Sequence, residues 1–244
     1  FGKWLTAAAL AVGCTVMTAN AFADTDGHWA ESAINKWSGE YGIIQGYDDG
    51  TFRPDKSITR GAFAGILDRF LHFQNASPAD TFSDTAGTYW EDAILKLHAS
   101  GIYLGNQGAA LPSSTITRQQ AVAMIGRAFR IAPETAAPDY TDTDQIAEYA
   151  MAYVGEFEVR GYLTDSAAGT FRPTDPITRA DLIHILSNMV DTLVKETTTV
   201  TENVSGSLLI SAADGATLKG IKIGGDLILA PGVTKDVTLV DCVI

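Results

Sequence analysis

The tripeptide Ile58-Thr59-Arg60 decides the fold of this chain, because it occurs three times. The second copy is Ile116-Thr117-Arg118 and the third is Ile177-Thr178-Arg179, so the copies start 58 and 61 residues apart. Repetition at a nearly constant period indicates a modular architecture, in which one supersecondary unit is used several times. We therefore interpret most of the chain as three consecutive units.

Other residues recur at matching places in the units, which makes the repetition specific. A glycine-rich turn precedes the tripeptide, and it reads Gly50-Thr51-Phe52-Arg53-Pro54 in the first unit and Gly169-Thr170-Phe171-Arg172-Pro173 in the third. The second unit has lost a residue there and ends in Ala110-Leu111-Pro112. Each unit also opens with an aromatic residue, any residue and an aspartate. The three openings are Phe22-Ala23-Asp24, Phe82-Ser83-Asp84 and Tyr140-Thr141-Asp142.

Hydrophobic spacing predicts two helices in each unit. In the first unit, aromatic residues and an alanine fall four residues apart from Trp29 to Tyr41, which is one face of an amphipathic helix. Thr59 is a favourable N-cap for a second helix, whose apolar residues run from Phe63 to Phe70. A pair of helices cannot bury an apolar face alone, so we predict that the three units close around a shared core.

Residues 22–194 resemble the S-layer homology (SLH) family, through these openings, turns and Ile-Thr-Arg copies and through Trp29-Ala30. The resemblance implies a mainly α fold, in which three helix-loop-helix SLH repeats form a three-helix prism. The implied repeats are residues 22–80, 81–138 and 139–196. It also implies that the protein is anchored to the bacterial cell wall by binding a secondary cell-wall polysaccharide, commonly through a pyruvylated sugar.

Arg60, Arg118 and Arg179 are the main candidate ligand-binding residues. Each follows the N-cap threonine and falls in the first helical turn, where a cation is unfavourable beside the positive end of the helix dipole. Because all three units repeat this choice, we predict an anion at each helix start, held by the guanidinium and by free backbone N–H groups. A pyruvyl carboxylate fits this description. The alternative is a salt bridge from each arginine to an aspartate of a neighbouring unit.

Gly46, Gly105, Trp29 and Trp90 complete the predicted binding site. The glycines lie in the loop between the two helices, where the absence of a side chain lets a sugar ring approach the backbone. A turn that requires positive φ is the alternative. The tryptophans suit stacking on a sugar face, and their helical spacing fits a buried core role equally well.

The third unit departs most from the pattern. It has Asp165 where the others have a loop glycine, and Ala147 where they have tryptophan. We therefore expect function to carry over best to the first unit and least to the third, although a groove between units can use an arginine from a weak one.

Residues 1–21 have the features of a signal peptide. The run from Leu5 to Met17 is apolar and small, but it is shorter than the roughly 20 residues that span a membrane. We expect cleavage after Ala21, with cleavage after Ala23 as the alternative. Cys14 offers a lipoprotein alternative. We predict a secreted protein of the cell wall or cell surface (S-layer), without a transmembrane segment.

The chain is acidic, with a formal net charge of −12. Nucleic-acid binding needs a basic footprint, so we predict no nucleic-acid partner. An acidic wall polymer must then be attracted by a few local arginines rather than by the field of the whole protein. The four histidines are scattered, and no zinc-ligand spacing, nucleophile elbow or phosphate loop occurs. We predict no cofactor, no metal site and no enzymatic activity.

Residues 197–244 read as a β-rich region. Gly206-Ser207-Leu208-Leu209-Ile210 is echoed 19 residues later by Gly225-Asp226-Leu227-Ile228-Leu229. Short strands at this spacing indicate the coils of a parallel β-helix. Ile244 directly follows a predicted strand, so we expect this region to be truncated.

Three functions follow from these features. The leading hypothesis is a noncatalytic cell-wall anchoring module of a secreted bacterial surface protein. The second is a wall-anchored enzyme, whose catalytic β-helix lies largely downstream of Ile244. The third is a structural subunit that self-assembles into a surface layer.

Overall fold

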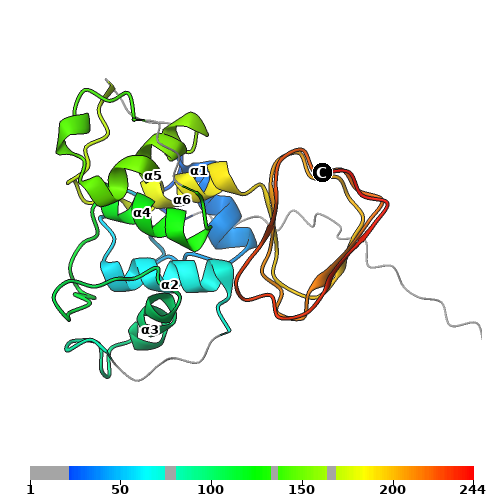
Figure 1. Ribbon diagram of the computed structural model, residues 1–244, viewed down its shortest axis with the longest axis horizontal. Coiled ribbons are helices and arrows are strands. Elements are labelled where there is room, and N and C mark those ends of the chain that lie inside the picture. Colours follow the sequence, from blue (N-terminus) through cyan, green and yellow to red (C-terminus); the bar gives the residue numbers. More distant parts are fainter. Residues whose placement is uncertain (1–21, 75–80, 133–136, 164–168) are drawn as a thin grey trace, which may run out of the picture.

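The computed structural model describes residues 22–74, 81–132, 137–163 and 169–244; the predicted signal peptide, Cys14 and Asp165 lie outside these ranges. In the described part, helices come first and a coil of parallel strands follows (Figure 1). Helix α1 continues as the π-helical segment η1 (Asn35–Glu40), and a 3-10 turn, η2 (Thr143–Gln145), precedes α5. The α-helices are α1 (Glu31–Ile34), α2 (Arg60–Leu71), α3 (Glu91–Ala99), α4 (Arg118–Ala128), α5 (Glu148–Val159) and α6 (Arg179–Met189).

The threonine of each tripeptide caps a helix, as predicted. The Thr59 side chain accepts a hydrogen bond from the backbone N–H of Ala62, at 3.2 Å, and α2 starts at the next residue. Thr117 and Thr178 cap α4 and α6 in the same way, and both belong to full capping boxes. A cap of this kind stabilises a helix by about 1 kcal/mol, which explains why three helices begin at the same place in the repeated sequence.

The isoleucines of the three tripeptides are buried and join the units at one point. Ile58 donates its backbone N–H to the carbonyl of Ile177 at 3.1 Å, and Ile116 donates to Ile58 at 3.1 Å. Ile177 closes the ring by donating to Ile116 at 3.0 Å. Each unit is therefore hydrogen-bonded to both of the others at the start of its second helix.

Neighbouring units pack helix against helix. Helix α2 contacts α3 of the next unit, α4 contacts α5, and α6 contacts α1, so the third unit returns to the first. Large side chains from all three units lie in one buried cluster, which includes Trp37, Phe63, Phe70 and Phe157. Burial of a side chain of this size contributes about 1.5–3 kcal/mol, and the shared core is what the sequence predicted.

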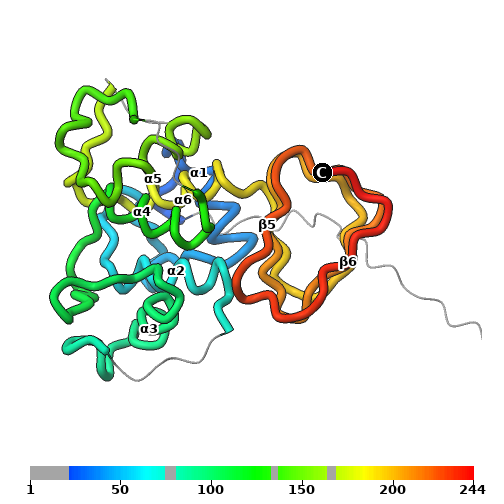
Figure 2. Tube along the Cα trace, in the orientation of Figure 1, coloured from blue at the N-terminus to red at the C-terminus, as the bar shows by residue number. Residues whose placement is uncertain are grey.

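The strands form two parallel three-stranded sheets, ordered β1-β3-β5 and β2-β4-β6. Leu208 pairs with Leu227, which confirms the 19-residue spacing expected from the sequence. Successive turns of the chain lie over one another (Figure 2). The strands are β1 (Thr192–Val194), β2 (Thr199–Val200), β3 (Leu208–Ile210), β4 (Ala216–Lys219), β5 (Leu227–Leu229) and β6 (Val237–Val240), so the first strand begins inside the range predicted for the third repeat.

The strand coil shares a core with the helices. Leu193, Leu209 and Ala230 belong to the same buried cluster as the helical residues. At the first strand, the Tyr41 hydroxyl accepts from the backbone N–H of Leu193 at 3.3 Å, and Lys195 Nζ donates to the Tyr41 carbonyl at 2.6 Å. In the described part of the chain, no helix combines the length and apolar character needed to cross a membrane.

Candidate functional site

The opening aspartate of each unit holds the turn that precedes the tripeptide. Both carboxylate oxygens of Asp24 accept backbone N–H groups, from Phe52 and Arg53, at 2.7 Å each. Burial raises the pKa of Asp24, but these hydrogen bonds outweigh it, so that the pKa lies below its ordinary value. Asp84 and Asp142 make the same pair of contacts with the turns of their own units.

These turns contain a strained residue, which explains why a carboxylate holds them. Arg53 has a φ of 57°, Leu111 one of 58° and Arg172 one of 57°. Side-chain-bearing residues rarely adopt this left-handed conformation, and it persists only where surrounding contacts impose it. The two charge-assisted hydrogen bonds from each aspartate provide such contacts.

Each tripeptide arginine reaches the turn of the following unit. Arg60 Nε donates to the carbonyl of Ala110 at 2.8 Å, and Arg118 Nε donates to that of Phe171 at 2.9 Å. Arg179 Nε donates to the carbonyl of Phe52 at 2.8 Å, which returns to the first unit. All three arginines are buried. We name these three contacts the Arg60, Arg118 and Arg179 junctions.

The predicted free backbone N–H groups at the helix starts are already bonded, so this part of the site prediction is wrong. Arg60 N donates to Ser114 O at 2.8 Å, and Gly61 N donates to Pro112 O at 2.9 Å. The first two N–H groups of α4 and α6 are bonded in the same way to the turn of the next unit. Closure of the three units uses these donors, and attraction of an anion therefore depends on side chains.

The three junctions differ in how the guanidinium is surrounded. Arg118 forms a salt bridge with Asp181 of the third unit, at 3.3 Å, which is the alternative that the sequence left open. Arg179 donates a second hydrogen bond, to the carbonyl of Gln45 at 2.6 Å. An aromatic ring is common to all three: the guanidinium lies 4.8 Å from the Tyr103 ring centre for Arg60, 5.4 Å from that of Phe171 for Arg118 and 4.4 Å from that of Phe52 for Arg179.

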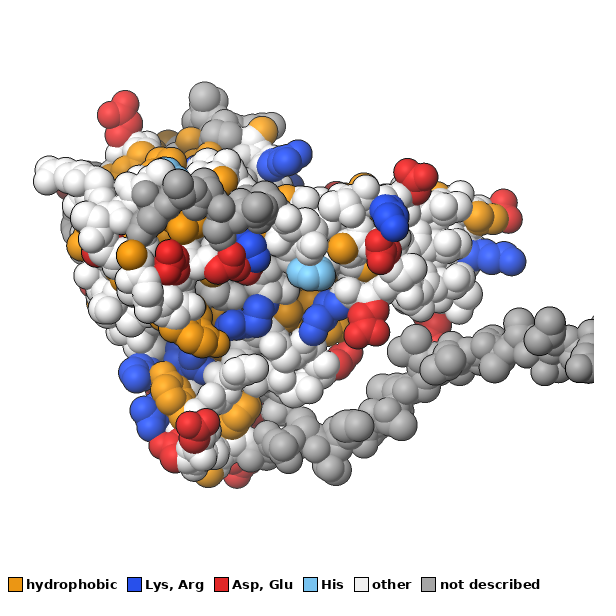
Figure 3. Space-filling view, turned by 90° about the horizontal axis from the view of Figure 1, so that it is seen from below, with side chains coloured by type: hydrophobic (Ala, Val, Ile, Leu, Met, Phe, Trp, Pro, Cys, Tyr) orange, Lys and Arg blue, Asp and Glu red, His pale blue; other side chains and the backbone are white. Residues whose placement is uncertain are grey.

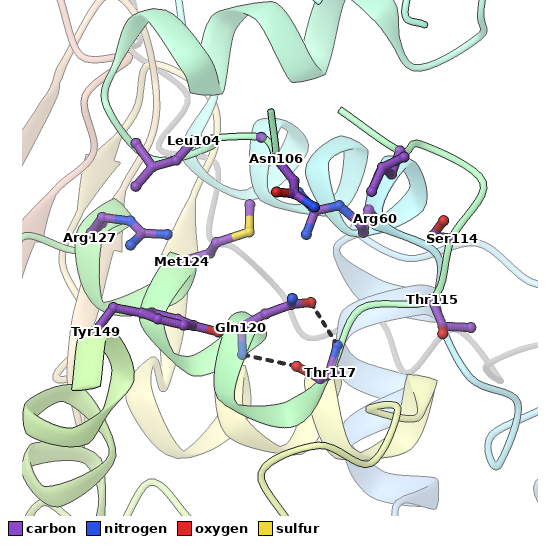
Figure 4. Close-up of a pocket in the computed structure, with 12 residues that line it drawn as sticks. Arg60, Leu104, Asn106, Ser114, Thr115, Thr117, Gln120, Met124, Arg127 and Tyr149 are labelled. Atoms are coloured by element: carbon purple, nitrogen blue, oxygen red, sulfur yellow. Dashed lines mark hydrogen bonds between the residues drawn. The ribbon is translucent and has the colours of Figure 1, made fainter. Parts of the chain in front are cut away.

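The Arg60 junction opens into a cavity of about 490 Å³. Arg60 enters it from α2, while Gln120 and Arg127 enter from α4 and Tyr149 from α5 (Figure 4). The loop of the second unit, including Gly105, closes another side. The lining residues include two arginines and no aspartate or glutamate. A volume of this size is within the range of ligand pockets in proteins.

Elsewhere the surface carries charges of both signs. On the face seen in Figure 3, lysine and arginine side chains alternate with aspartate and glutamate rather than forming one basic patch. The absence of carboxylates from the cavity at the Arg60 junction is therefore a local property in a chain with a formal net charge of −12. Such a pocket favours an anionic or strongly polar ligand.

Arg127 is a cavity residue that the sequence prediction missed. Its Nε donates to the carbonyl of Ile102 at 3.1 Å, and burial lowers its pKa. Arg69 holds the equivalent position in α2 and donates to the carbonyl of Ile43 at 2.8 Å. Both arginines follow a tripeptide arginine by nine residues, and the third unit has Asn188 there. This second repeated arginine was the signal that could have identified Arg127.

The loop glycines have different reasons for being glycine. Gly105 has a φ of 69° and lines the cavity, so the turn explanation applies to it. Gly46 does not have positive φ; a Cβ there would lie 2.2 Å from the ring of Phe22. The turn interpretation is thus wrong for Gly46, and its glycine allows the opening aromatic residue to pack against the loop.

The two predicted tryptophans are in unlike surroundings. Trp90 packs on α2, because Gly61 and Gly65 leave room for its ring. Trp29 is 54% exposed and lies edge-on to His184, with 5.2 Å between ring centroids. The interpretation of Trp29 as a buried core residue is wrong. Neither tryptophan lines the cavity at the Arg60 junction.

Two regions of the chain, residues 21–64 and 139–183, match the S-layer homology domain family model. A cellulosome-anchoring protein of Acetivibrio thermocellus is 36% identical over 124 residues, which are 48% of this chain and 28% of that protein. An amylopullulanase of Thermoanaerobacterium thermosulfurigenes is 25% identical over 176 residues, 70% of this chain and 9% of the enzyme. S-layer protein EA1 of Bacillus anthracis is 24% identical over 214 residues, 80% of this chain and 24% of that protein.

The chain thus matches the S-layer homology family model in two regions and spans less than a third of each of these relatives. The family match, together with anchoring and surface-layer proteins among the relatives, confirms the prediction of a secreted, cell-surface protein.

Proposed function

We propose that the described residues form a noncatalytic anchoring module, which binds an acidic, pyruvylated secondary cell-wall polysaccharide in grooves between its units. The observation that carries this proposal is the cavity at the Arg60 junction, which has two arginines and no carboxylate among its lining residues. In fold terms, we propose that the three units are SLH repeats in a three-helix prism, and that the strand coil is a parallel β-helix.

Arg60 suits a carboxylate ligand chemically. A guanidinium has five N–H donors in a planar fork, and Nε already binds the carbonyl of Ala110. The side chain also hydrogen-bonds Tyr103, and its guanidinium lines the cavity (Figure 4). A carboxylate that accepts from such a fork makes a charge-assisted pair, which is stronger than a neutral hydrogen bond. The contact with Ala110 fixes the guanidinium in place before a ligand arrives.

The junctions rank the predicted binding residues differently from the sequence of each unit alone. Arg179 belongs to the atypical third unit, but it faces the loop of the first unit through Gln45 and Phe52. Arg118 faces the third unit and has the carboxylate of Asp181 beside it. We therefore propose that Arg60 and Arg179 serve ligand-binding grooves, and that Arg118 chiefly stabilises its junction.

Binding to isolated wall sacculi tests this function. A charged hydrogen bond contributes about 1.5–3 kcal/mol, so Arg60→Ala should weaken binding about tenfold to a hundredfold. Arg60→Lys should restore only part of it, because an ammonium cannot bind a carboxylate through two parallel bonds. Arg118→Ala should lower the melting temperature while changing affinity less than Arg60→Ala does. Equal binding of the wild type to sacculi with and without their secondary polysaccharide would contradict the proposal.

A wall-anchored enzyme is the second candidate, and the relatives include an amylopullulanase. Because the matched segment is 9% of that protein, any catalytic activity of this kind would lie outside the matched residues. The sequence of the full gene and an assay of its product on wall and plant polysaccharides would decide between the two. Lattice formation by the full protein, seen by electron microscopy, would instead favour a surface-layer subunit, as the name of the S-layer relative suggests.

A further inference from the structure

The second repeated arginine, Arg69 or Arg127, is absent from one junction. In the described part of the chain, that junction is the one where the tripeptide arginine forms an ion pair. Arg127 shares the cavity with Arg60. At the Arg179 junction, burial lowers the pKa of Arg179, and the charges of Arg53 and Arg69 lower it further. At the remaining junction Arg118 is paired with Asp181, and the equivalent second position is Asn188.

Arg60 and Arg127 together place two positive charges around one cavity. Burial raises the pKa of Tyr149 above its ordinary value. The positive charges of Arg127 and Arg60 each oppose this rise. In Figure 4 the two arginine side chains point into the cavity from either side of Met124. Like charges in a partly buried site repel one another, and the lining residues include no carboxylate that offsets this cost.

Arg127 also has donors that the protein leaves open to the cavity. Among the described residues, its side-chain hydrogen bond is the one from Nε to the carbonyl of Ile102, at 3.1 Å. That contact fixes the position of the guanidinium, just as Ala110 fixes that of Arg60. Two positioned guanidiniums that line one cavity without a carboxylate are suited to two anionic groups on one ligand.

We propose that Arg127 binds a second anionic group of the wall polysaccharide, so that the cavity recognises two negative charges spaced along one polymer rather than a single pyruvyl carboxylate. The second group is a carboxylate or a phosphate. This inference rests on the proposed function. Recognition of two charges would explain how an acidic protein selects one acidic polymer among several.

The test is titration of polysaccharide released from wall sacculi into four proteins: the wild type, Arg60→Gln, Arg127→Gln and Arg130→Gln. Arg130 is exposed and three residues from Arg127, so its variant is a control for the loss of one positive charge. Each protein is titrated with native polysaccharide and with polysaccharide from which mild acid has removed the pyruvyl groups. Thermal melting of each variant shows whether it remains folded, and Arg127→Lys provides a conservative second variant.

We expect Arg127→Gln to weaken binding of the native polymer at least fivefold, and to weaken binding of the depyruvylated polymer by a similar factor. Arg60→Gln should weaken binding of the native polymer only, because the depyruvylated polymer lacks the carboxylate that Arg60 binds. Arg130→Gln should bind like the wild type. Amidation of the remaining carboxyl groups identifies the second anion: loss of the Arg127 effect assigns a carboxylate, and its persistence assigns a phosphate.

Two results would overturn the inference while leaving the proposed function intact. One is unchanged affinity of folded Arg127→Gln and Arg127→Lys for the native polymer. The other is an Arg127 effect that disappears with the pyruvyl groups, since both arginines would then bind the same carboxylate. Failure of the wild type to bind any released polysaccharide would instead reject the proposed function itself.

Discussion

The Arg60 and Arg118 junctions share one backbone arrangement and differ in their side chains. In both, the arginine donates to a turn carbonyl of the next unit, and an aspartate carboxylate accepts hydrogen bonds from the backbone N–H groups of that turn. At the Arg60 junction, Trp90 packs on Gly61, and the cavity wall has Gln120 and no carboxylate. At the Arg118 junction, Ala147 replaces Trp90, Gln119 replaces Gly61 and Asp181 replaces Gln120.

The difference separates the contacts that all three junctions share from the side chains that we propose recognise a ligand. Closure uses main-chain hydrogen bonds together with the Nε of each tripeptide arginine, and these contacts recur at all three junctions. We propose that recognition relies on the charge of a few side chains around each guanidinium, and these side chains change from one junction to the next. Exchanging residues between matching positions is therefore the most direct way to test both properties.

The largest expected effect comes from Gly61→Gln, which gives the Arg60 junction the residue found at the Arg118 junction. A Cβ at this position would lie 2.4 Å from Trp90 Cδ1 and 3.0 Å from the carbonyl of Pro112. Overpacking of this kind costs about 1–3 kcal/mol, and we expect a loss near the upper end in the free energy of unfolding by urea. Gln119→Ala removes the acceptor of the hydrogen bond that the backbone N–H of Ala147 donates, and it should lower the free energy of unfolding by about 1 kcal/mol. Equal stability of the Gly61 variant and the wild type would show that Trp90 moves freely.

Gln120→Asp should convert the electrostatics of the Arg60 junction into those of the Arg118 junction. A carboxylate at this position would partly neutralise Arg60 and Arg127, and we expect about tenfold weaker binding of wall polysaccharide, equivalent to about 1.4 kcal/mol. Stability should change little, because Asp181 fills the same place in the capping box of α6. Gln120→Asn is the uncharged control, and a similar loss in both variants would argue against an electrostatic cause.

The reverse exchange, Asp181→Gln, should have a smaller effect. It removes the carboxylate beside Arg118 and retains a side chain that completes the capping box, as Gln120 does in α4. Because Asn188 replaces the second arginine there, we expect about a two- to threefold gain in affinity, equivalent to about 0.4–0.7 kcal/mol. The melting temperature should fall, because the buried Arg118 loses its ion-pair partner. Asp144→Asn removes the same charge from an exposed position of the third unit. A gain of the same size in that control would reflect net charge alone.

Acid should weaken the aspartate contacts with the turns, with the smallest effect on stability. Burial raises the pKa of Asp24, but its backbone hydrogen bonds lower it more. Hydrogen bonds from Thr51 and Arg53 lower the pKa of Asp49 to about 2. A depressed pKa means that the stabilisation is present above the ordinary value of 3.8 and is lost as the pH falls toward the folded values.

Melting temperature measured between about pH 5 and pH 2 checks this sign. The wild type should lose stability steadily below about pH 4, and the double variant Asp24→Asn, Asp49→Asn should show a shallower decline over the same range. Parallel curves for the two proteins would mean that other carboxylates control acid unfolding.

Helix starts and the strand spacing were predictable because their signals are local. A threonine caps N–H groups within the next three residues, and hydrophobic periodicity requires only a few turns of chain. The surroundings of Trp29 and Trp90 were not predictable in this way. Both precede a helix with the same apparent spacing, but Gly65 lies under one ring and His184 beside the other.

The sequence by itself determined three equivalent units, three capped helices with an arginine in the first turn, and a region of stacked strands. Only the tertiary structure decided what those arginines contact. Their turn partners lie 50, 53 and 127 residues away along the chain, in another unit. Packing of the units also occupies the N–H groups at the helix starts, and it brings Arg127 and Arg60 to the same cavity. Helix formation is fixed by neighbours in sequence, whereas the charge of a groove depends on side chains that meet only when all three units have closed.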